Sequence, residues 1–191
     1  MWAAPWHDES VDDRALVDAV RAGDREALGT LVALETRAVY RTSLRILGRP
    51  EDAEDVTQET FVAAIRAIRS FRGDGPIRAW LLRIATRQAF RRLAARRPTA
   101  NVDDVDERLT ADSRDEPTRI LVAAERRDDV RRAVGALPEP YREVVALRFF
   151  GELSLAEVAD ATGRPINTVK THLRRGLERL RPIVGGGGLA R

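Results

Sequence analysis

The sequence has no cysteine, only two histidines (His7 and His172) and few aromatic residues. Without cysteine there are no disulfides, no thiolate catalysis and none of the usual zinc modules, and two isolated histidines do not make a metal site. No stretch approaches the roughly 20 apolar residues that a membrane-spanning helix needs, and residues 1–10 lack the basic and apolar segments of a signal peptide. We therefore expect a cytoplasmic protein with no metal, no cofactor and no insertion into a membrane.

Strand patterns and internal repeats are also missing, and apolar residues recur instead at helical spacing. The expected fold is all-α: two small helical domains, residues 12–97 and 118–182, joined by an acidic linker at 98–117. Residues 1–11 are expected to form a flexible N-terminal arm and residues 183–191 a flexible tail. Glycine, proline and capping residues divide the domains into helices, which are expected at 12–22, 24–47, 51–69, 77–97, 118–135, 139–150, 154–162 and 167–180.

A net charge of +3 conceals strong segregation of charge along the chain. Residues 50–60 carry five acids and no base, and residues 98–118 carry seven acids against two arginines. By contrast, residues 71–97 carry eight arginines against one aspartate, and residues 164–181 carry six bases against one glutamate. Blocks of this size indicate separate contact surfaces, two for nucleic acid and at least one for a basic partner.

Residues 154–180 are typical of a helix-turn-helix. Ser154 and Glu157 form a capping box at the start of its first helix, Gly163 suits the left-handed end of that helix, and Pro165 cannot continue it. Asn167 can cap the second helix. That helix has an apolar side and an opposite side that carries mostly hydrogen-bond donors. The apolar side consists of Ile166, Val169, Leu173, Leu177 and Leu180, and the opposite side of Lys170, Thr171, Arg174, Arg175 and Glu178.

Such donors reach phosphates and guanine edges when a helix lies in a major groove. A lone basic helix is more often a solvated face, but here it follows a capped helix and a glycine turn, and this combination favours duplex DNA binding. His172 is interpreted as a groove-edge or surface residue and not as a metal ligand.

The helix expected at residues 51–69 carries an acidic stripe of Asp52, Asp55 and Glu59, edged by Val56 and Val62. Such a stripe is either a solvated face or a docking surface for a basic helix, and composition alone favours the solvated face. The other side is expected to be buried through Ala53, Thr57, Phe61, Ala64, Ile65 and Ile68. The preceding helix is expected to bury Leu28, Leu31, Leu34, Ala38, Leu44 and Leu47.

Residues 71–76 form a loop by their glycines and proline, and the helix that follows is apolar on most of its circumference. Arg83, Arg87 and Arg91 recur every four residues and form one basic stripe on it. A loop followed by such a stripe suits single-stranded nucleic acid, with phosphates on the stripe and an unstacked base in the loop. The expected core residues are Ile77, Trp80, Leu81, Ile84 and Leu93, with a stacking platform as the alternative role of Trp80.

Segments in order along the chain resemble motifs of the extracytoplasmic-function (ECF) sigma factors of bacterial RNA polymerase. They are DAEDVTQETF (residues 52–61), FRG (71–73), AWLLRIA (79–85), LPEPYREVVALRFF (137–150), LSLAEVA (153–159) and TVKTHLRRG (168–176). Each motif is weak alone, but the ordered set is specific, and the resemblance covers residues 12–182. It implies a promoter-specificity subunit that is not an enzyme in its own right.

The resemblance also implies partners for each surface. The acidic stripe becomes the face that docks on the clamp helices of the polymerase's largest subunit, which reverses the preference for a solvated face; its residues are Asp52, Asp55, Gln58 and Glu59. The loop and the arginine stripe become the surface for the melted minus-ten strand, through Phe71, Arg72, Gly73, Ile77, Arg83, Arg87 and Arg91. The helix-turn-helix becomes the reader of the minus-thirty-five promoter duplex, through Thr168, Lys170, Thr171, His172, Arg174 and Arg175. It also docks on the flap of the second-largest subunit, and an anti-sigma factor is a further expected partner.

Two positions depart from the family pattern, which commonly has phenylalanine at the place of Ile77 and asparagine at the place of Arg87. The family's minus-ten sequence preference is therefore not carried over.

Two other functions are weighed against that of a promoter-specificity subunit. A free-standing repressor would explain residues 154–180 but not the acidic helix, and an enzyme such as a recombinase would need a catalytic constellation that the sequence HDES at residues 7–10 does not supply.

Overall fold

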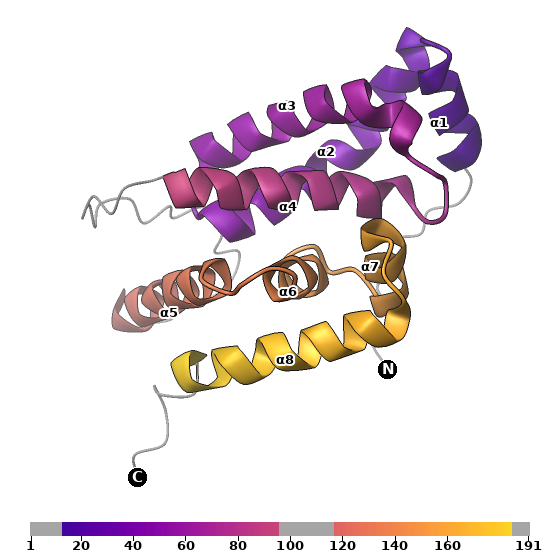
Figure 1. Ribbon diagram of the computed structural model, residues 1–191. Helices are drawn as coiled ribbons and strands as arrows, with labels where there is room; N and C mark the ends of the chain where they lie inside the picture. The colour runs from indigo at the N-terminus through magenta and orange to yellow at the C-terminus, as the bar shows by residue number, and fades with distance from the viewer. Residues whose placement is uncertain (1–12, 96–116, 185–191) are drawn as a thin grey trace.

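The computed structural model describes residues 13–95 and 117–184, which contain helices but no strand. The N-terminal unit consists of α1 (Asp13–Arg21), α2 (Arg25–Leu47), α3 (Pro50–Ala67), the 3-10 helix η1 (Ile68–Ser70) and α4 (Ile77–Ala95); the C-terminal unit consists of α5 (Pro117–Gly135), α6 (Tyr141–Phe149), α7 (Leu155–Thr162) and α8 (Ile166–Val184) (Figure 1). The all-α prediction is confirmed. In these two ranges no helix is long and apolar enough to cross a bilayer.

The expected arm, and most of the expected linker and tail, lie outside the described residues. The structure nevertheless assigns Pro117 to α5, where the sequence predicts the end of the linker. It also continues α8 through Pro182 to Val184, past the expected end at residue 180.

Capping residues define several helix ends. The side chain of Asp24 caps α2, and Gly48 ends it in the left-handed conformation with φ of 74°. At α7, Ser154 and Glu157 form the predicted capping box, and Gly163 ends the helix with φ of 66°. The turn between the two helices of the helix-turn-helix is therefore encoded locally.

Helix α8 begins one residue earlier than the sequence predicts. The amides of Thr168 and Val169 donate to the carbonyl of Pro165 at 2.8 and 3.1 Å, so the first turn is already formed at Ile166. Asn167 consequently lies inside the helix, where its carbonyl accepts a hydrogen bond from the Thr171 hydroxyl. The prediction that Asn167 caps the helix is wrong.

The two units pack against each other and share their apolar core. In the N-terminal unit α2, α3 and α4 pack together, and α4 also contacts α5, α6 and α7. One cluster of buried side chains contains Leu82 and Ala85 of α4 together with Val144, Leu147 and Val158 of the C-terminal unit. Figure 1 shows α4 lying along the C-terminal unit, with α6 and α7 beneath it and α8 on the far side. Because α4 is apolar on most of its circumference, it can serve both units at once.

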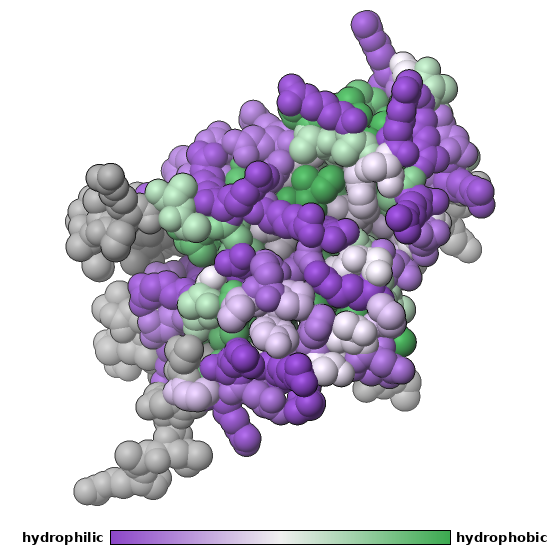
Figure 2. Space-filling view, in the orientation of Figure 1, coloured by the Kyte–Doolittle hydropathy of each residue, from purple (hydrophilic) through white to green (hydrophobic). Residues whose placement is uncertain are grey.

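Several expected core residues are exposed, and one expected edge residue is buried. Leu34 is 48% exposed because α2 buries Glu35 and Val39, each one residue further along the chain than the expected Leu34 and Ala38. Val56, expected beside the acidic stripe, is fully buried. The other exposed residues are Ile65, Ile166 and Leu177. On the face drawn in Figure 2 the surface is mostly hydrophilic, with small hydrophobic areas in both halves.

Candidate nucleic-acid and docking surfaces

Helix α8 presents an exposed basic face. Lys170, Arg174 and Arg175 are all exposed, whereas Thr168 and Thr171 are half-buried. Arg174 is held by Glu178, one turn away, at 2.6 Å between Nη1 and Oε1. The structure therefore brings most of the predicted duplex-reading residues to one side of α8, which is the side that faces away from the rest of the C-terminal unit.

His172 differs from the other predicted duplex-reading residues. Its ring packs edge-on against Tyr141 of α6, with the centroids 5.6 Å apart, and its Nδ1 atom is buried with no hydrogen-bond partner among the described residues. Burial lowers the pKa of His172, and the charges of Arg164 and Arg175 lower this pKa further. The half-buried imidazole is therefore part of the packing between α8 and α6.

The loop before α4 has an anchored start and an exposed middle. Phe71 is buried and packs on Trp80, with ring centroids 5.5 Å apart, and its carbonyl accepts a hydrogen bond from the Arg21 guanidinium. Arg72 and Gly73 are exposed, and Gly73 has φ of 80°. The loop forms one wall of a cleft of about 410 Å³ whose other wall is the C-terminal end of α7.

Ile77 does not present its side chain to this cleft. It is 1% exposed and belongs to the apolar core, and its amide donates a 3.4 Å hydrogen bond to Asp13 of α1. The predicted side-chain contact between Ile77 and DNA is therefore not available in this structure. Its role here is to anchor the start of α4.

The arginine stripe of α4 is occupied by a glutamate that sequence reasoning missed. Glu143 of α6 accepts from Nε of Arg83 at 3.0 Å and from Nε of Arg87 at 2.9 Å. Its second oxygen accepts from Arg164 of the helix-turn-helix turn at 2.6 Å. The Glu143 side chain is only 3% exposed. Arg91, the third member of the stripe, is exposed and makes no ion pair with any residue that the structure describes.

The surroundings of Glu143 keep it charged. Burial alone would raise the pKa of Glu143, but hydrogen bonds from Arg164 and Arg83 and the charges of Arg83 and Arg87 outweigh burial, so the pKa is lowered. One signal in the sequence pointed to such a partner, because Glu143 precedes the apolar run Val144 to Leu147 and a buried carboxylate needs compensating charge.

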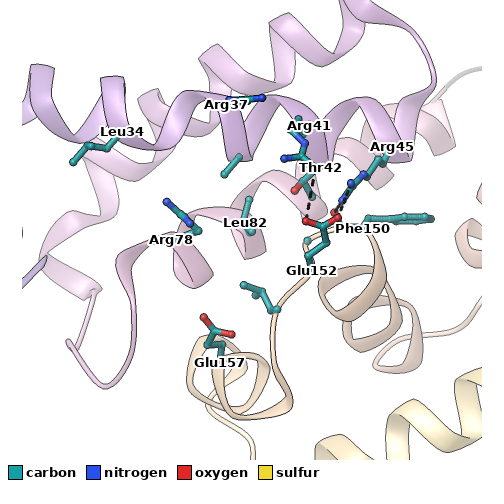
Figure 3. Close-up of a pocket in the computed structure, with 13 residues that line it drawn as sticks. Leu34, Arg37, Arg41, Thr42, Arg45, Arg78, Leu82, Phe150, Glu152 and Glu157 are labelled. Atoms are coloured by element: carbon teal, nitrogen blue, oxygen red, sulfur yellow. Dashed lines mark hydrogen bonds and ion pairs between the residues drawn. The ribbon is translucent and has the colours of Figure 1, made fainter. Parts of the chain in front are cut away.

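A second contact between the units forms at the turn between α6 and α7. Glu152, which has φ of 58°, pairs with Arg45 of α2 at 2.6 Å and with Arg41 at 3.8 Å. Arg45 also donates to the Phe150 carbonyl at 2.9 Å. Figure 3 shows Glu152 pointing from this turn toward Arg41 and Arg45 across a pocket of about 510 Å³.

The acidic stripe of α3 is gathered by one arginine that sequence reasoning also missed. Arg92 of α4 pairs with Asp52 at 2.8 Å, with Asp55 at 2.5 Å and with Glu59 at 3.4 Å. Asp55 and Glu59 nevertheless keep side-chain exposures of 55% and 57%. With the exposed Gln58, they line a shallow hollow on the outside of the N-terminal unit.

An apolar groove lies on the C-terminal unit between α5, α6 and α8. It has a volume of about 700 Å³. Two of its lining residues are exposed large hydrophobic side chains, Phe149 at 52% and Leu177 at 41%. Leu177 was predicted to be a core residue, but it is exposed and lines this groove.

Among the described residues no group of histidine, aspartate and glutamate side chains is arranged to hold a metal ion.

Comparisons with known proteins agree with the arrangement of two units. The family description "Sigma-70 region 2" matches residues 31–99, and "Sigma-70, region 4" matches residues 127–180. The chain is 32% identical to the ECF RNA polymerase sigma factor SigW of Bacillus subtilis, over 86% of this chain and 92% of that protein. It is 33% identical to the ECF RNA polymerase sigma-E factor of Escherichia coli K12, over 89% of this chain and 93% of that protein.

A solved structure has the same arrangement of helices. CnrH, in complex with the cytosolic domain of CnrY, superposes with a TM-score of 0.63 at 26% identity, over 92% of this chain and 99% of CnrH. RpoE of Bartonella quintana, solved with the anti-sigma factor NepR, has a TM-score of 0.54 over 84% of this chain and 98% of RpoE; its 18% identity supports the fold alone. The helix-turn-helix, the two matched regions and the full-length relatives together show that this chain belongs to the ECF sigma factors of bacterial RNA polymerase.

Proposed function

We propose that this sigma factor reads its promoter with two surfaces, α8 on minus-thirty-five duplex and the region from Phe71 to Arg91 on the melted minus-ten strand. As an ECF sigma factor the chain directs promoter-specific transcription initiation, in the cytoplasm where RNA polymerase works. Catalysis of RNA synthesis belongs to the polymerase. The observation that carries the proposal is the capped helix-turn-helix whose second helix has an exposed basic face.

Duplex reading by α8 is supported by its accessibility and by its side chains. The helix lies on the side of the C-terminal unit opposite to α4 (Figure 1), so the N-terminal unit does not cover it. Lys170, Arg174 and Arg175 are exposed and are the side-chain types that bind guanine edges and phosphates in a major groove. The half-buried residues of α8 orient the helix and contact the DNA backbone at the edge of the major groove; they are Thr168, Thr171 and His172.

Binding of the melted strand is supported by the loop and by the charge of α4. The Phe71 and Trp80 rings form a rigid apolar base under the loop, while Arg72 and Gly73 are free to meet an extruded nucleotide. Arg83, Arg87 and Arg91 then supply cations along the path of the strand. Unstacking a base costs a few kcal/mol, and this cost is offset when the base is held in a pocket and its phosphates are paired.

Docking on the polymerase clamp is supported by the acidic stripe. Arg92 draws together Asp52, Asp55 and Glu59 on one side of α3, and two of these carboxylates stay exposed. A partially neutralised acidic ridge beside the 48% exposed Val62 offers both charge and apolar area to a basic helix of the largest subunit. Gln58, on the same surface, can donate and accept hydrogen bonds.

Docking on the flap of the second-largest subunit is supported by the apolar groove. Phe149 and Leu177 stand exposed at a groove that Val134, Val145 and Leu180 complete, and an exposed apolar groove of this kind receives an apolar helix face. An anti-sigma factor is a further inferred partner of this chain, because CnrH, which is 26% identical to it, was solved in complex with the cytosolic domain of CnrY.

The two DNA surfaces can be tested separately in the assembled holoenzyme. A promoter is first selected from a random library, and then binding is measured to its upstream duplex and to its single-stranded minus-ten segment. Arg175→Ala is expected to weaken only duplex binding, and Arg72→Ala only strand binding. Arg132→Ala serves as the control, since this exposed arginine lies on α5 and pairs with Asp129. Equal loss of both activities in either variant would contradict the assignment of the two surfaces.

A further inference from the structure

We propose that the free protein is latched shut by two carboxylates of the C-terminal unit, Glu143 and Glu152, and that Glu143 competes with DNA phosphates for the arginine stripe. The competition rests on the proposed function, because it assumes that Arg83 and Arg87 bind the melted strand. The latch itself rests only on contacts between the two units.

Glu143 lies where a phosphate of the strand would have to lie. It accepts from Arg83 at 3.0 Å and from Arg87 at 2.9 Å, and Arg164 holds its other oxygen at 2.6 Å. One carboxylate, with a single negative charge, is thus shared by three guanidiniums, and a guanidinium can bind a carboxylate or a phosphate through the same donors. The Glu143 side chain is 3% exposed and that of Arg83 is 25% exposed, so Glu143 must leave Arg83 before a strand can bind that arginine. Arg87 is 57% exposed, and Glu143 competes for its Nε only.

The loop side of the strand surface is blocked as well. A Cβ atom placed on Gly75 would lie 2.7 Å from Cβ and 3.0 Å from Oδ2 of Asp160 at the end of α7. The cleft beside the loop therefore has a carboxylate in one wall, which repels a phosphate. Arg83 also donates a hydrogen bond to the Ala161 carbonyl at 2.8 Å, and this bond holds the end of α7 against α4 beside the same cleft.

Glu152 makes the second set of ion pairs between the two units. Its pairs with Arg45 and Arg41 join the turn between α6 and α7 to α2, as Figure 3 shows. Glu152 holds the left-handed conformation, φ of 58°, which is unfavourable for a residue with a side chain. Local hydrogen bonds hold this turn, from the Gly151 amide to the Ala146 carbonyl at 3.0 Å and from the Leu153 amide to the Leu147 carbonyl at 3.2 Å, and they aim the Glu152 side chain at α2.

The latch covers one DNA surface and leaves the other free. Helix α8 lies on the far side of the C-terminal unit from α4 (Figure 1), and its basic residues are exposed in the closed form. Duplex binding therefore needs no opening, whereas strand binding does. The apparent affinity for the strand is the affinity of the open form multiplied by the fraction of molecules that are open. This order prevents the free protein from sequestering single-stranded DNA.

Opening can be measured directly because the sequence has no cysteine. Two exposed alanines, Ala33 of α2 and Ala156 of α7, are replaced with cysteine and labelled, and the distance between the labels is measured by electron paramagnetic resonance or by fluorescence transfer. Glu143→Gln keeps the shape of the side chain but removes the charge that three arginines require. The matched control is Glu139→Gln, which removes an exposed carboxylate that pairs with Arg142 in the same unit.

In Glu143→Gln the labels are expected to move apart without any DNA, while the control keeps the short distance of the parent chain. Affinity for the selected single-stranded minus-ten oligonucleotide is expected to rise about tenfold, and affinity for the upstream duplex to stay unchanged. Unchanged label distance with intact helicity would overturn the latch. If Glu143→Gln does not fold, the exposed Glu152→Gln is used, where an unchanged distance has the same meaning. Wider spacing without tighter strand binding would retain the latch and refute the strand-binding role of the arginine stripe.

Discussion

Gly176 of α8 should be the glycine whose replacement most directly disturbs the DNA-reading helix. A methyl group added there would lie 2.7 Å from Cγ2 of Val145 and 3.5 Å from Cβ of Tyr141, both on α6. Val145 is 2% exposed, and its methyl group already contacts the backbone side of α8 at this position. Overpacking of this kind costs about 1–3 kcal/mol, and the better helix propensity of alanine returns about 0.5–1 kcal/mol. The net range is therefore about 0–2.5 kcal/mol, and we expect Gly176→Ala to lower the free energy of unfolding by about 1 kcal/mol, near its middle.

Thermal unfolding followed by circular dichroism measures this difference. For a chain of this length the expected fall in Tm is roughly 2–4 °C. Gly29→Ala is the matched control, because Gly29 lies in α2, is exposed and has nothing within 4 Å of an added Cβ. It should stabilise the protein by about 0.5–1 kcal/mol. A Tm that rises equally in both variants would refute the close approach of α6 and α8.

Three further predictions concern charged residues. Arg175→Ala should weaken promoter binding by about 1–3 kcal/mol and relax the preference at one upstream position; equal weakening on every duplex would reassign Arg175 to phosphate. Reversing the charge of both Asp55 and Glu59 to arginine should abolish co-purification with core polymerase at unchanged helicity, whereas reversal of the exposed Glu54 should not. The pKa of Glu143 is lowered in the folded state, so its contribution to stability is present at neutral pH and is lost as the pH falls through the lowered value. In acid titrations the stability advantage of wild type over Glu143→Gln should therefore shrink below about pH 4; a constant difference would show that Glu143 is not held charged.

The sequence was sufficient to predict what local rules determine. The capping box at Ser154 and Glu157 and the left-handed end at Gly163 appear as expected, because each depends on residues within one turn. The register of long helices was less predictable. On α2 the buried side lies one residue away from the predicted side, so that Leu34 is exposed. The apolar residues of this helix fit more than one buried side almost equally well, and only the packing partners decide between them.

Contacts between distant segments were not predictable from periodicity. The sequence indicated that Arg83 and Arg87 form a stripe, but their partner Glu143 lies 56 to 60 residues away and on another helix. Arg92 likewise looked like one more base near the end of α4, and only the packing of α3 against α4 brings it to the acidic stripe. The expectation of two domains on a tether also gave no sign that α4 supplies core to both units.

The most direct test of the account is transcription by purified core RNA polymerase on the selected promoter, with and without this chain. The account predicts specific transcripts only when the chain is present, and their loss with the double reversal at Asp55 and Glu59. Tight binding of the chain alone to promoter duplex, with no effect on initiation by core polymerase, would contradict it.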